Sequence, residues 1–472
     1  MIELIRALKV RDIVLFNVVA IVGTRWISLA AATGPSSVSL WILALILFFI
    51  PQSVAVIHLS RKYPVEGGVY EWAKVEFGDF HGFVAGWCYW ANNLVYYPSL
   101  LISVAAIAPY IVPGASMAAP GKLFIAMASL IILWIAIGFN VVGLKIGKWV
   151  QNIGAIGTFV PILVIASLAG IIIYFGKSQT HFSFSNILPT KLDYGTLSFW
   201  SSMCFGLAGL ELAAVMSGEI VDAKKTIPRA TYLSGIAIVF VYLVGTISLL
   251  VGLSSKDVNL VTGLVQSIQA LEAKTGLRYL TNASALLVTL AGIGGAGAWL
   301  AGSARILFVT GIDSYLPRSF GKVHPKWKTP YVAILFQGVV TTVFLLMSFI
   351  GSSTEQAYLV LVDATIIVYF IPYIYIFLAS VKSIRRDSAA NIGRRNTMKA
   401  ILSVVGGVTT IAAILLTLFP PDAGGNPVLF LAKTLLGSLA FVAFGIVVFL
   451  YAKKNNSKLQ GLSSKQTTNS SS

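Results

Sequence analysis

The chain has 472 residues, of which 57% are hydrophobic and 11% charged, with a net charge of +17 and a mean hydropathy of +0.85. Ordinary globular chains carry about 25% charged residues, so a soluble protein of this composition would expose a large apolar surface to water. These values exclude a soluble enzyme and a large receptor ectodomain, and they indicate a polytopic membrane protein.

Long apolar runs, bounded by charges or by Pro and Gly, predict an all-α integral membrane protein. One span takes roughly 20 apolar residues, so the chain has room for about 12 transmembrane helices. The runs lack the alternation of an outer-membrane barrel. The predicted spans are 11–34, 39–60, 82–112, 122–142, 150–175, 196–218, 231–253, 281–309, 331–350, 357–381, 398–419 and 428–452.

The order of these spans predicts two sets of five helices followed by a final pair. Five is an odd number, so the second set crosses the membrane in the opposite orientation to the first. The residues after Lys453 are rich in Ser, Asn and Gln and are expected to be disordered. The predicted parts are a cytoplasmic N-terminus (1–10), a first repeat (11–175), a second repeat (196–381), helices 11 and 12 (398–452) and a disordered cytoplasmic tail (453–472).

Lys and Arg are unevenly divided between the two faces of the predicted bundle. With the N-terminus inside, 26 of the 34 cations, including Arg305, lie on the cytoplasmic side, 7 lie opposite and Arg25 lies within a span. This bias predicts a multi-pass protein of the cell inner (cytoplasmic) membrane with both termini cytoplasmic. Topology thus explains the positive charge, and no nucleic-acid partner is expected.

Two segments outside the spans have helical character. The segment 63–81, which reads YPVEGGVYEWAKVEFGDFH, mixes acids and aromatics and predicts a short cytoplasmic helix. The segment 254–280 has apolar residues at rough helical spacing, so we expect an interfacial helix on the outer surface.

Two spans are interrupted at mid-membrane by glycine and polar residues. The first contains Gly23, Thr24 and Arg25, and the sixth contains Gly206, Gly209 and Glu211. Backbone leaves the helix inside a membrane only where it is buried in protein or lines a cavity. Interruptions at matching positions of inverted halves are typical of a transporter substrate site.

A broken helix suits a zwitterionic ligand for an electrostatic reason. One side of the break presents free N–H groups and a positive dipole end, and the other presents free carbonyls and a negative end. A carboxylate and an ammonium group can therefore bind in one gap. Helix 8 is also rich in glycine, but there we interpret the glycines as sites of close helix packing.

Five motifs occur in order along the chain: the helix 1 break, YPVEGGVYEW, GWCYWANNLVYYP, FGLAGLE with SGEIVDAKKTIPRA, and ARILFVTGIDSYLP. In these motifs the chain resembles the amino acid/polyamine/organocation (APC) superfamily of secondary transporters, over residues 10 to about 380. It is most similar to bacterial amino acid permeases, with some similarity to plant polyamine carriers. The resemblance implies a leucine-transporter-like fold, with a 5+5 inverted repeat, helices 1 and 6 broken, and two C-terminal helices.

The resemblance also implies a substrate site, residue by residue. The substrate carboxylate would meet the N–H groups of Gly23, Thr24 and Arg25, and the α-amine would meet carbonyls around Ile21, Val22 and Phe205. Phe205 falls at the place of a gating aromatic, and Trp299 either takes a second gating position or lies in the core. With Asn93 added from the polar face of helix 3, the predicted substrate-binding set is Ile21, Val22, Gly23, Thr24, Arg25, Asn93, Phe205, Gly206, Gly209 and Trp299.

Arg25 departs from the family, which commonly has a small residue at this position. An arginine in a span costs several kcal/mol unless it is paired or hydrated. Several roles remain open: an ion pair with Glu211 or Asp363, a substitute for a sodium ion, a fork-shaped donor to an anionic substrate side chain, or snorkelling to an interface.

The ionisable and polar residues in the spans are candidates for coupling and gating. Glu211, in the family's G-x-E element, is the hypothesised proton-coupling or gating carboxylate. Asp363 either takes part in transport or supports helix 1, and Tyr96 shares a polar face of helix 3 with Asn93. Proton-coupled relatives carry a lysine where this chain has Thr158. A charged cluster around Glu219 either forms an inner gate with Arg11 or Asp12 or is a solvated face.

We therefore predict a secondary active transporter that moves amino acids by alternating access, coupled to protons or by exchange. A polyamine transporter of the same fold is the alternative. An enzyme is not expected, because the chain has 4 His and no nucleophile or metalloprotease motif in a span. The predicted partners are an amino acid, protons and the lipid bilayer, with no cofactor and no metal.

Overall fold

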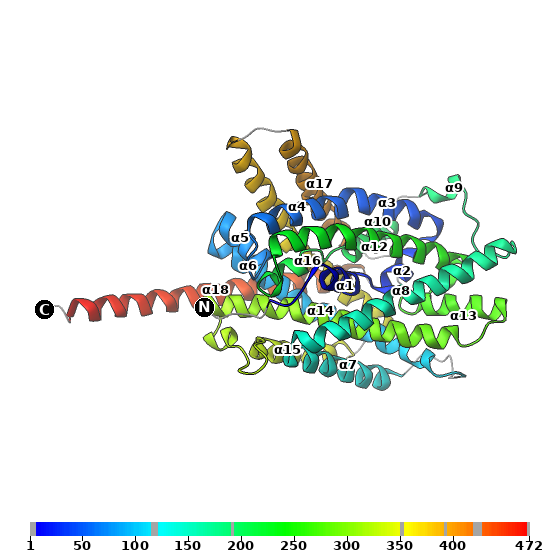
Figure 1. Ribbon diagram of the computed structural model, residues 1–472, viewed down its shortest axis with the longest axis horizontal. Helices are drawn as coiled ribbons and strands as arrows, with labels where there is room; N and C mark the ends of the chain where they lie inside the picture. The colour runs from blue at the N-terminus through cyan, green and yellow to red at the C-terminus, as the bar shows by residue number, and fades with distance from the viewer. Residues whose placement is uncertain are drawn as a thin grey trace.

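The computed structural model describes residues 6–114, 121–189, 193–349, 354–390, 394–418 and 427–469. These residues form a bundle of helices joined by short segments (Figure 1), with an isolated parallel bridge between Leu8 and Ile220 as their β pairing. In this part of the chain, ten helices are long and apolar enough to cross a membrane, and one bent pair forms an eleventh span. This architecture confirms the predicted all-α membrane fold, with ten to eleven of the expected 12 spans found among the described residues.

The spans that are continuous agree with the predicted runs, apart from their ends. The first of them combines several short helical stretches from Gly34 to Lys62, including α3 (Ser37–Ala44) and α4 (Ile50–Lys62). The others are α6 (Asp79–Ile107), α7 (Lys122–Val142), α8 (Leu144–Tyr174), α12 (Ala223–Gly252), α14 (Leu280–Ile312), α15 (Tyr331–Ser348), α16 (Thr354–Ala390), α17 (Arg394–Thr417) and α18 (Pro427–Asn469).

The first span is broken where the sequence predicts it. Helix α1 (Val10–Ile21) ends at two extended residues, Val22 and Gly23, and α2 (Thr24–Ala31) continues at an angle of 45°. A Cβ atom at Gly23 would lie 2.9 Å from Cδ1 of Trp26, so glycine is required for this close approach.

The sixth span is broken by a longer non-helical segment. Helix α10 (Tyr194–Gly206) is followed by the segment 207–211 and by the four-residue helix α11 (Leu212–Val215). Gly209 has φ of +126°, a conformation that residues with a side chain rarely adopt. Gly206 packs against Trp26, since a Cβ here would lie 3.0 Å from Cγ of that indole. The two breaks are therefore in direct contact.

The broken helices lie inside the bundle and contact the long helices. Helix α1, near the centre of Figure 1, packs against α8, α12 and α14, and α10 packs against α2, α3 and α17. Glycine allows close contacts here: a Cβ at Gly295 of α14 would lie 2.9 Å from the carbonyl oxygen of Val19. The interpretation of the helix 8 glycines as packing sites is thus confirmed.

Two short helices complete the fold outside the spans. Helix α5 (Val69–Phe77) confirms the helix predicted between helices 2 and 3. Helix α13 (Gly263–Thr275) also forms as predicted, but it does not lie free at an interface. Its apolar side chains, such as Ile268 and Leu271, are buried, because its apolar stripe packs against α8, α12 and α14.

The C-terminal segment differs from its prediction. Helix α18 continues to Asn469, whereas we expect disorder from residue 453 (Figure 1). No proline follows Pro427, so the sequence has no strong helix breaker after the last span.

Candidate functional site

A pocket opens beside the first helix break. The empty space in and at the mouth of this pocket is about 480 Å³. The pocket extends from the break along α6 to Ile107, away from the membrane face where α1 begins. We call the face where α1 begins the N-terminal face. The lining residues are Val19, Ala20, Val22, Gly23, Thr24, Arg25, Tyr96, Leu100, Ser103, Val104, Ile107, Thr158, Val288, Ala291, Gly292 and Gly295.

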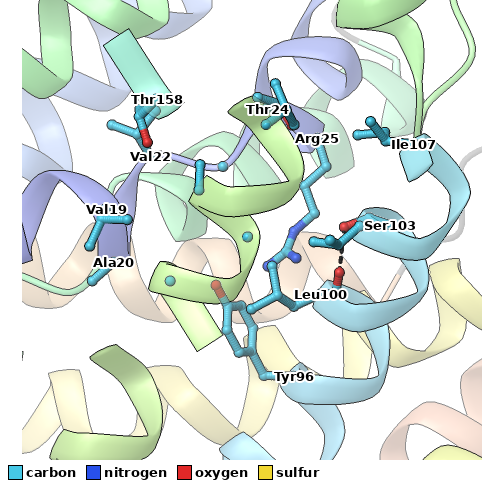
Figure 2. Close-up of a pocket in the computed structure, with 16 residues that line it drawn as sticks. Val19, Ala20, Val22, Thr24, Arg25, Tyr96, Leu100, Ser103, Ile107 and Thr158 are labelled. Carbon is cyan, nitrogen blue, oxygen red and sulfur yellow. Dashed lines mark hydrogen bonds between the residues drawn. The ribbon is translucent and has the colours of Figure 1, made fainter. Parts of the chain in front are cut away.

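Arg25 crosses this pocket from the first turn of α2 towards α6 (Figure 2). Its side chain is 1% exposed, and its guanidinium lies over the rings of Trp26 and Tyr96, at 4.7 Å from each centroid. None of its three side-chain nitrogens forms a well-aligned hydrogen bond with the described residues. The buried guanidinium is thus held by the faces of two aromatic rings and by the nearby Tyr96 hydroxyl.

An ion pair with Glu211, one of the roles left open for Arg25, is not formed. The Glu211 carboxylate accepts hydrogen bonds from the hydroxyls of Tyr89, at 3.1 Å, Tyr369 and Tyr373. The cause is steric, because aromatic rings separate the two charges. Asp363, the other proposed partner, lies in α16, but its side chain is outside the described part of the structure.

The separating rings form an aromatic cluster of Trp26, Tyr96, Phe205, Trp299 and Tyr369. Tyr96 contacts both Phe205 and Trp299, at centroid distances of 6.1 and 5.2 Å, and Tyr369 contacts the same two rings from the other side. Arg25 therefore lies on one side of the cluster and Glu211 on the other. The structure brings the two predicted gating aromatics, Phe205 and Trp299, into this cluster rather than into the pocket lining.

Tyr242 of α12 joins the two breaks. Its hydroxyl lies 2.7 Å from the carbonyl oxygens of both Ile21 and Gly206, and it accepts a hydrogen bond of 3.3 Å from the amide of Gly23. Its ring stacks on Trp41 at 4.5 Å. The sequence contains 18 Tyr, and no local pattern distinguishes this one, so sequence reasoning missed it.

Tyr242→Phe should reduce both thermal stability and transport rate. The change leaves buried carbonyl and amide groups at both breaks without their partner, at a cost of about 1–3 kcal/mol, while the stacked ring stays. Tyr232→Phe, on the exposed side of the same helix, is the matched control. Equal melting temperatures and rates for the two variants would contradict the role given to Tyr242.

The predicted site residues divide into two groups. Val22, Gly23, Thr24, Arg25, Tyr96 and Thr158 line the pocket, whereas Ile21, Asn93, Phe205, Gly206, Gly209 and Trp299 do not. The carbonyls of Ile21 and Phe205, proposed for the amine, already accept hydrogen bonds from Tyr242 and from the amide of Ala208. The Asn93 amide group donates to the Tyr89 carbonyl, and its Oδ1 atom is buried without a described partner.

The amides at the start of α2 are available to a ligand. The Gly23 amide donates to Tyr242 and the Trp26 amide to the Gly23 carbonyl. Between them, the amides of Thr24 and Arg25 have no acceptor among the residues that the structure describes. Free amides at a helix N-terminus, with the positive dipole end, form a site for an anionic group.

The N-terminal face is closed by a buried ion pair and by backbone pairing. Arg305 contacts the Glu219 carboxylate at 2.7 and 2.9 Å, and both side chains are at most 3% exposed. The amides of Ala7 and Leu8 donate to the Glu219 carbonyl. Arg305, which we count among the loop cations, is thus buried in an ion pair with Glu219, because its position near the end of α14 faces the segment after α11. An inner gate between the charged cluster and Arg11 or Asp12 stays a prediction.

Glu66 makes this closed face sensitive to pH. Its carboxylate accepts a 2.6 Å hydrogen bond from the Gly218 amide. Burial, followed by repulsion from Glu219, raises its pKa from 4.5 to about 8, while Arg305 and the Gly218 amide oppose the rise. The folded protein therefore binds more protons than the unfolded protein between these values, so stability should fall as pH rises through this window.

Glu66→Gln should remove much of this pH dependence. We expect the wild-type protein to lose about 1 kcal/mol or more of stability between pH 5 and pH 9, and the variant to lose less. Melting temperatures in detergent at three pH values test this, with the exposed Asp257→Asn as the control for loss of a carboxylate. An unchanged pH slope in Glu66→Gln would contradict the assignment.

These features together define a class of protein. Two broken helices, a pocket at one break, and an ion pair that closes one face are features of a secondary transporter with the leucine-transporter-like fold. The amino acid permease family model matches residues 12–457. The chain therefore belongs to the amino acid permease family of the APC superfamily, as the sequence motifs predict, and it is a multi-pass membrane transporter.

Several curated proteins are similar along most of the chain. An uncharacterized transporter of Legionella pneumophila is 29% identical over 96% of this chain and 98% of its own length. A probable agmatine/putrescine antiporter of Lactococcus lactis is 26% identical over 67% of each chain. A glutamate/gamma-aminobutyrate antiporter of the same species is 22% identical over 80% of this chain and 76% of its own.

Proposed function

We propose that this permease moves amino acids across the cytoplasmic membrane by alternating access, with both termini in the cytoplasm. One observation supports the substrate class above others: two free amides at the start of α2 lie beside an unpaired guanidinium in one pocket. In this proposal the substrate carboxylate binds the amides of Thr24 and Arg25, and the amine binds the remaining acceptor positions around Val22.

The alternative substrate is a polyamine. The relative named an agmatine/putrescine antiporter favours it, and the relative named a glutamate/gamma-aminobutyrate antiporter favours an amino acid. A polyamine carries no carboxylate and needs acidic partners. The lining residues include no Asp or Glu, and Arg25 would repel a cation. The pocket therefore supports the amino acid.

Alternating access requires that the N-terminal face open while the opposite side closes. In this conformation the buried Arg305–Glu219 pair and the bridge between Leu8 and Ile220 hold the N-terminal face shut. We propose that α1 and α11 move away from α14 to release substrate on this side. Tyr242 bonds both breaks, so it would make the two half-helices move together. Phe205 and Trp299 would then act as gates on the path from the pocket.

Proton coupling is assigned to Glu211. The carboxylate accepts three tyrosine hydroxyls, and Tyr373 in turn accepts the amide of Gly209 at 2.7 Å. Protonation turns one carboxylate oxygen into a donor, so one hydroxyl loses its acceptor. We propose that this change loosens the sixth span at its break. Asp363 and Thr158 remain candidates for a supporting role in coupling.

Uptake into proteoliposomes tests the proposed function. The protein is reconstituted and offered a panel of labelled amino acids, putrescine and agmatine, with and without a pH gradient or internal substrate. We expect at least one amino acid to accumulate and the polyamines to give the signal of empty liposomes. Uptake of a polyamine and of no amino acid would replace the proposal by its alternative.

A further inference from the structure

We propose that the substrate carries a second acidic group, and that Arg25 determines this specificity by binding it. The substrate class is then an anionic amino acid of the glutamate or aspartate type. The inference rests on the proposed function, and it adds which amino acids enter the pocket and why.

The first step in the argument is the electrical state of the pocket. Arg25 contributes a guanidinium group to the pocket. It is the one charged residue among those that line the pocket, and the Glu211 carboxylate is occupied by tyrosines beyond the aromatic cluster. A zwitterionic substrate has no net charge, so it would leave this pocket with a buried positive charge. An amino acid with an anionic side chain carries one net negative charge and neutralises it.

The second step is the number of hydrogen-bond donors without an acceptor. Nε, Nη1 and Nη2 of Arg25 form no well-aligned hydrogen bond with the described residues, and the Tyr96 hydroxyl, which interacts with the guanidinium, offers one acceptor for five N–H donors. Buried polar groups normally have a partner. The empty positions therefore correspond to an acceptor that arrives with the substrate.

The third step separates two anion positions in the pocket. The amides of Thr24 and Arg25 lie at the start of α2. The Arg25 side chain extends away from them, so its guanidinium lies near α6, beside Tyr96, Leu100 and Ser103 (Figure 2). One carboxylate at the amides leaves the guanidinium free. A planar guanidinium binds a second carboxylate in a bidentate fork, which a glutamine or asparagine amide does not match.

The residues of α6 that line the pocket agree with two separate anion positions. The Ser103 hydroxyl donates to the Leu100 carbonyl at 2.7 Å, so its oxygen faces the pocket as an acceptor and not as a further donor. Other lining residues near this end are apolar, such as Val104 and Ile107. Arg25 is therefore the group that selects a charged side chain over an apolar one in this half of the pocket.

The test uses pairs of substrates that differ in charge but not in size. Uptake of the labelled amino acid is measured against unlabelled glutamate, glutamine, aspartate and asparagine as competitors. In the wild-type protein we expect glutamate to compete at least about 30-fold better than glutamine, since hydrogen bonds to charged groups are strong. In Arg25→Gln the ratio should fall to about 1, through weaker glutamate binding, while glutamine changes by less than about 3-fold. Arg25→Lys should fall between the two.

Three results would overturn the inference that Arg25 binds an acidic side chain of the substrate. Equal competition by glutamate and glutamine in the wild-type protein does so without any variant, so the test does not depend on whether Arg25→Gln folds. Equal loss of both in Arg25→Gln, with a normal elution profile in detergent, would assign Arg25 to the backbone carboxylate or to structure. Transport that depends on chloride, at fixed pH, would assign the guanidinium to an inorganic anion. Transport of polyamines alone would instead reject the proposed function itself.

Discussion

Replacement of Glu211 by Gln should abolish uptake driven by a pH gradient and leave exchange of substrate across the membrane detectable. The carboxylate binds the hydroxyls of Tyr89, Tyr369 and Tyr373, and it is fully buried. Glutamine keeps the shape of the protonated acid, but it has no proton to release at neutral pH. We expect gradient-driven accumulation to fall by at least about 10-fold and exchange by less than about 3-fold, because exchange returns the carrier with substrate bound.

The comparison requires both assays in one preparation. Accumulation is measured with an inward proton gradient, and exchange with equal pH and unlabelled substrate inside the liposomes. Asp257→Asn, which removes an exposed carboxylate far from the breaks, is the control. Unchanged accumulation in Glu211→Gln would contradict the coupling role. Loss of both activities, with a lower melting temperature, would show that Glu211 is structural.

Replacement of Arg305 by Met should cause the largest loss of stability among the variants considered. It leaves the Glu219 carboxylate buried without its partner, and breaking a buried pair in this way costs about 3–5 kcal/mol. The double variant Glu219→Leu with Arg305→Met should recover much of this loss, because neither member of the pair is then left buried without its partner. Melting temperatures of the four proteins in the cycle give the coupling directly.

The exposed pair of Lys225 and Asp222 is the matched control for this cycle. Their side chains lie 3.2 Å apart and are 73% and 49% exposed, so Lys225→Ala should cost less than about 1 kcal/mol. The Arg305 variant should also open the N-terminal face. A cysteine placed at Ser217 should react faster with a polar thiol reagent in this variant than in wild type, since Cys88 and Cys204 are buried. Equal reactivity would contradict the assignment of the pair as a gate.

Local sequence patterns predict the elements of this fold well, because the apolar runs and their interruptions are short-range features. The run 122–142 coincides with α7 at both ends, and the first break falls at Gly23 as expected. The burial of α13, in contrast, cannot be predicted from local sequence patterns. Its apolar stripe is visible in the sequence, but whether lipid or protein covers it depends on helices that are distant in the chain.

The site is less predictable, because its contacts join residues far apart in sequence. Glu219 and Arg305 are separated by 86 positions, and each has the appearance of an ordinary loop charge. Tyr242, Tyr369 and Tyr373 fit their helices as any core aromatic would. The roles of their hydroxyls are visible only in the structure, where Tyr242 contacts the helix breaks and Tyr369 and Tyr373 contact the Glu211 carboxylate. Arg25 is the exception, since a charge beside a break is conspicuous in the sequence itself.

The central claim is that a carrier binds an amino acid at the first break and exposes it to the two sides in turn. Counterflow measures this most directly: proteoliposomes loaded with excess unlabelled substrate are diluted into a trace of labelled substrate, with no ion gradient. The account predicts a transient accumulation of label above the external concentration, which decays as the internal pool empties, and which only amino acids support. Label that rises to equilibrium without exceeding it, or that overshoots with polyamines alone, would contradict the account.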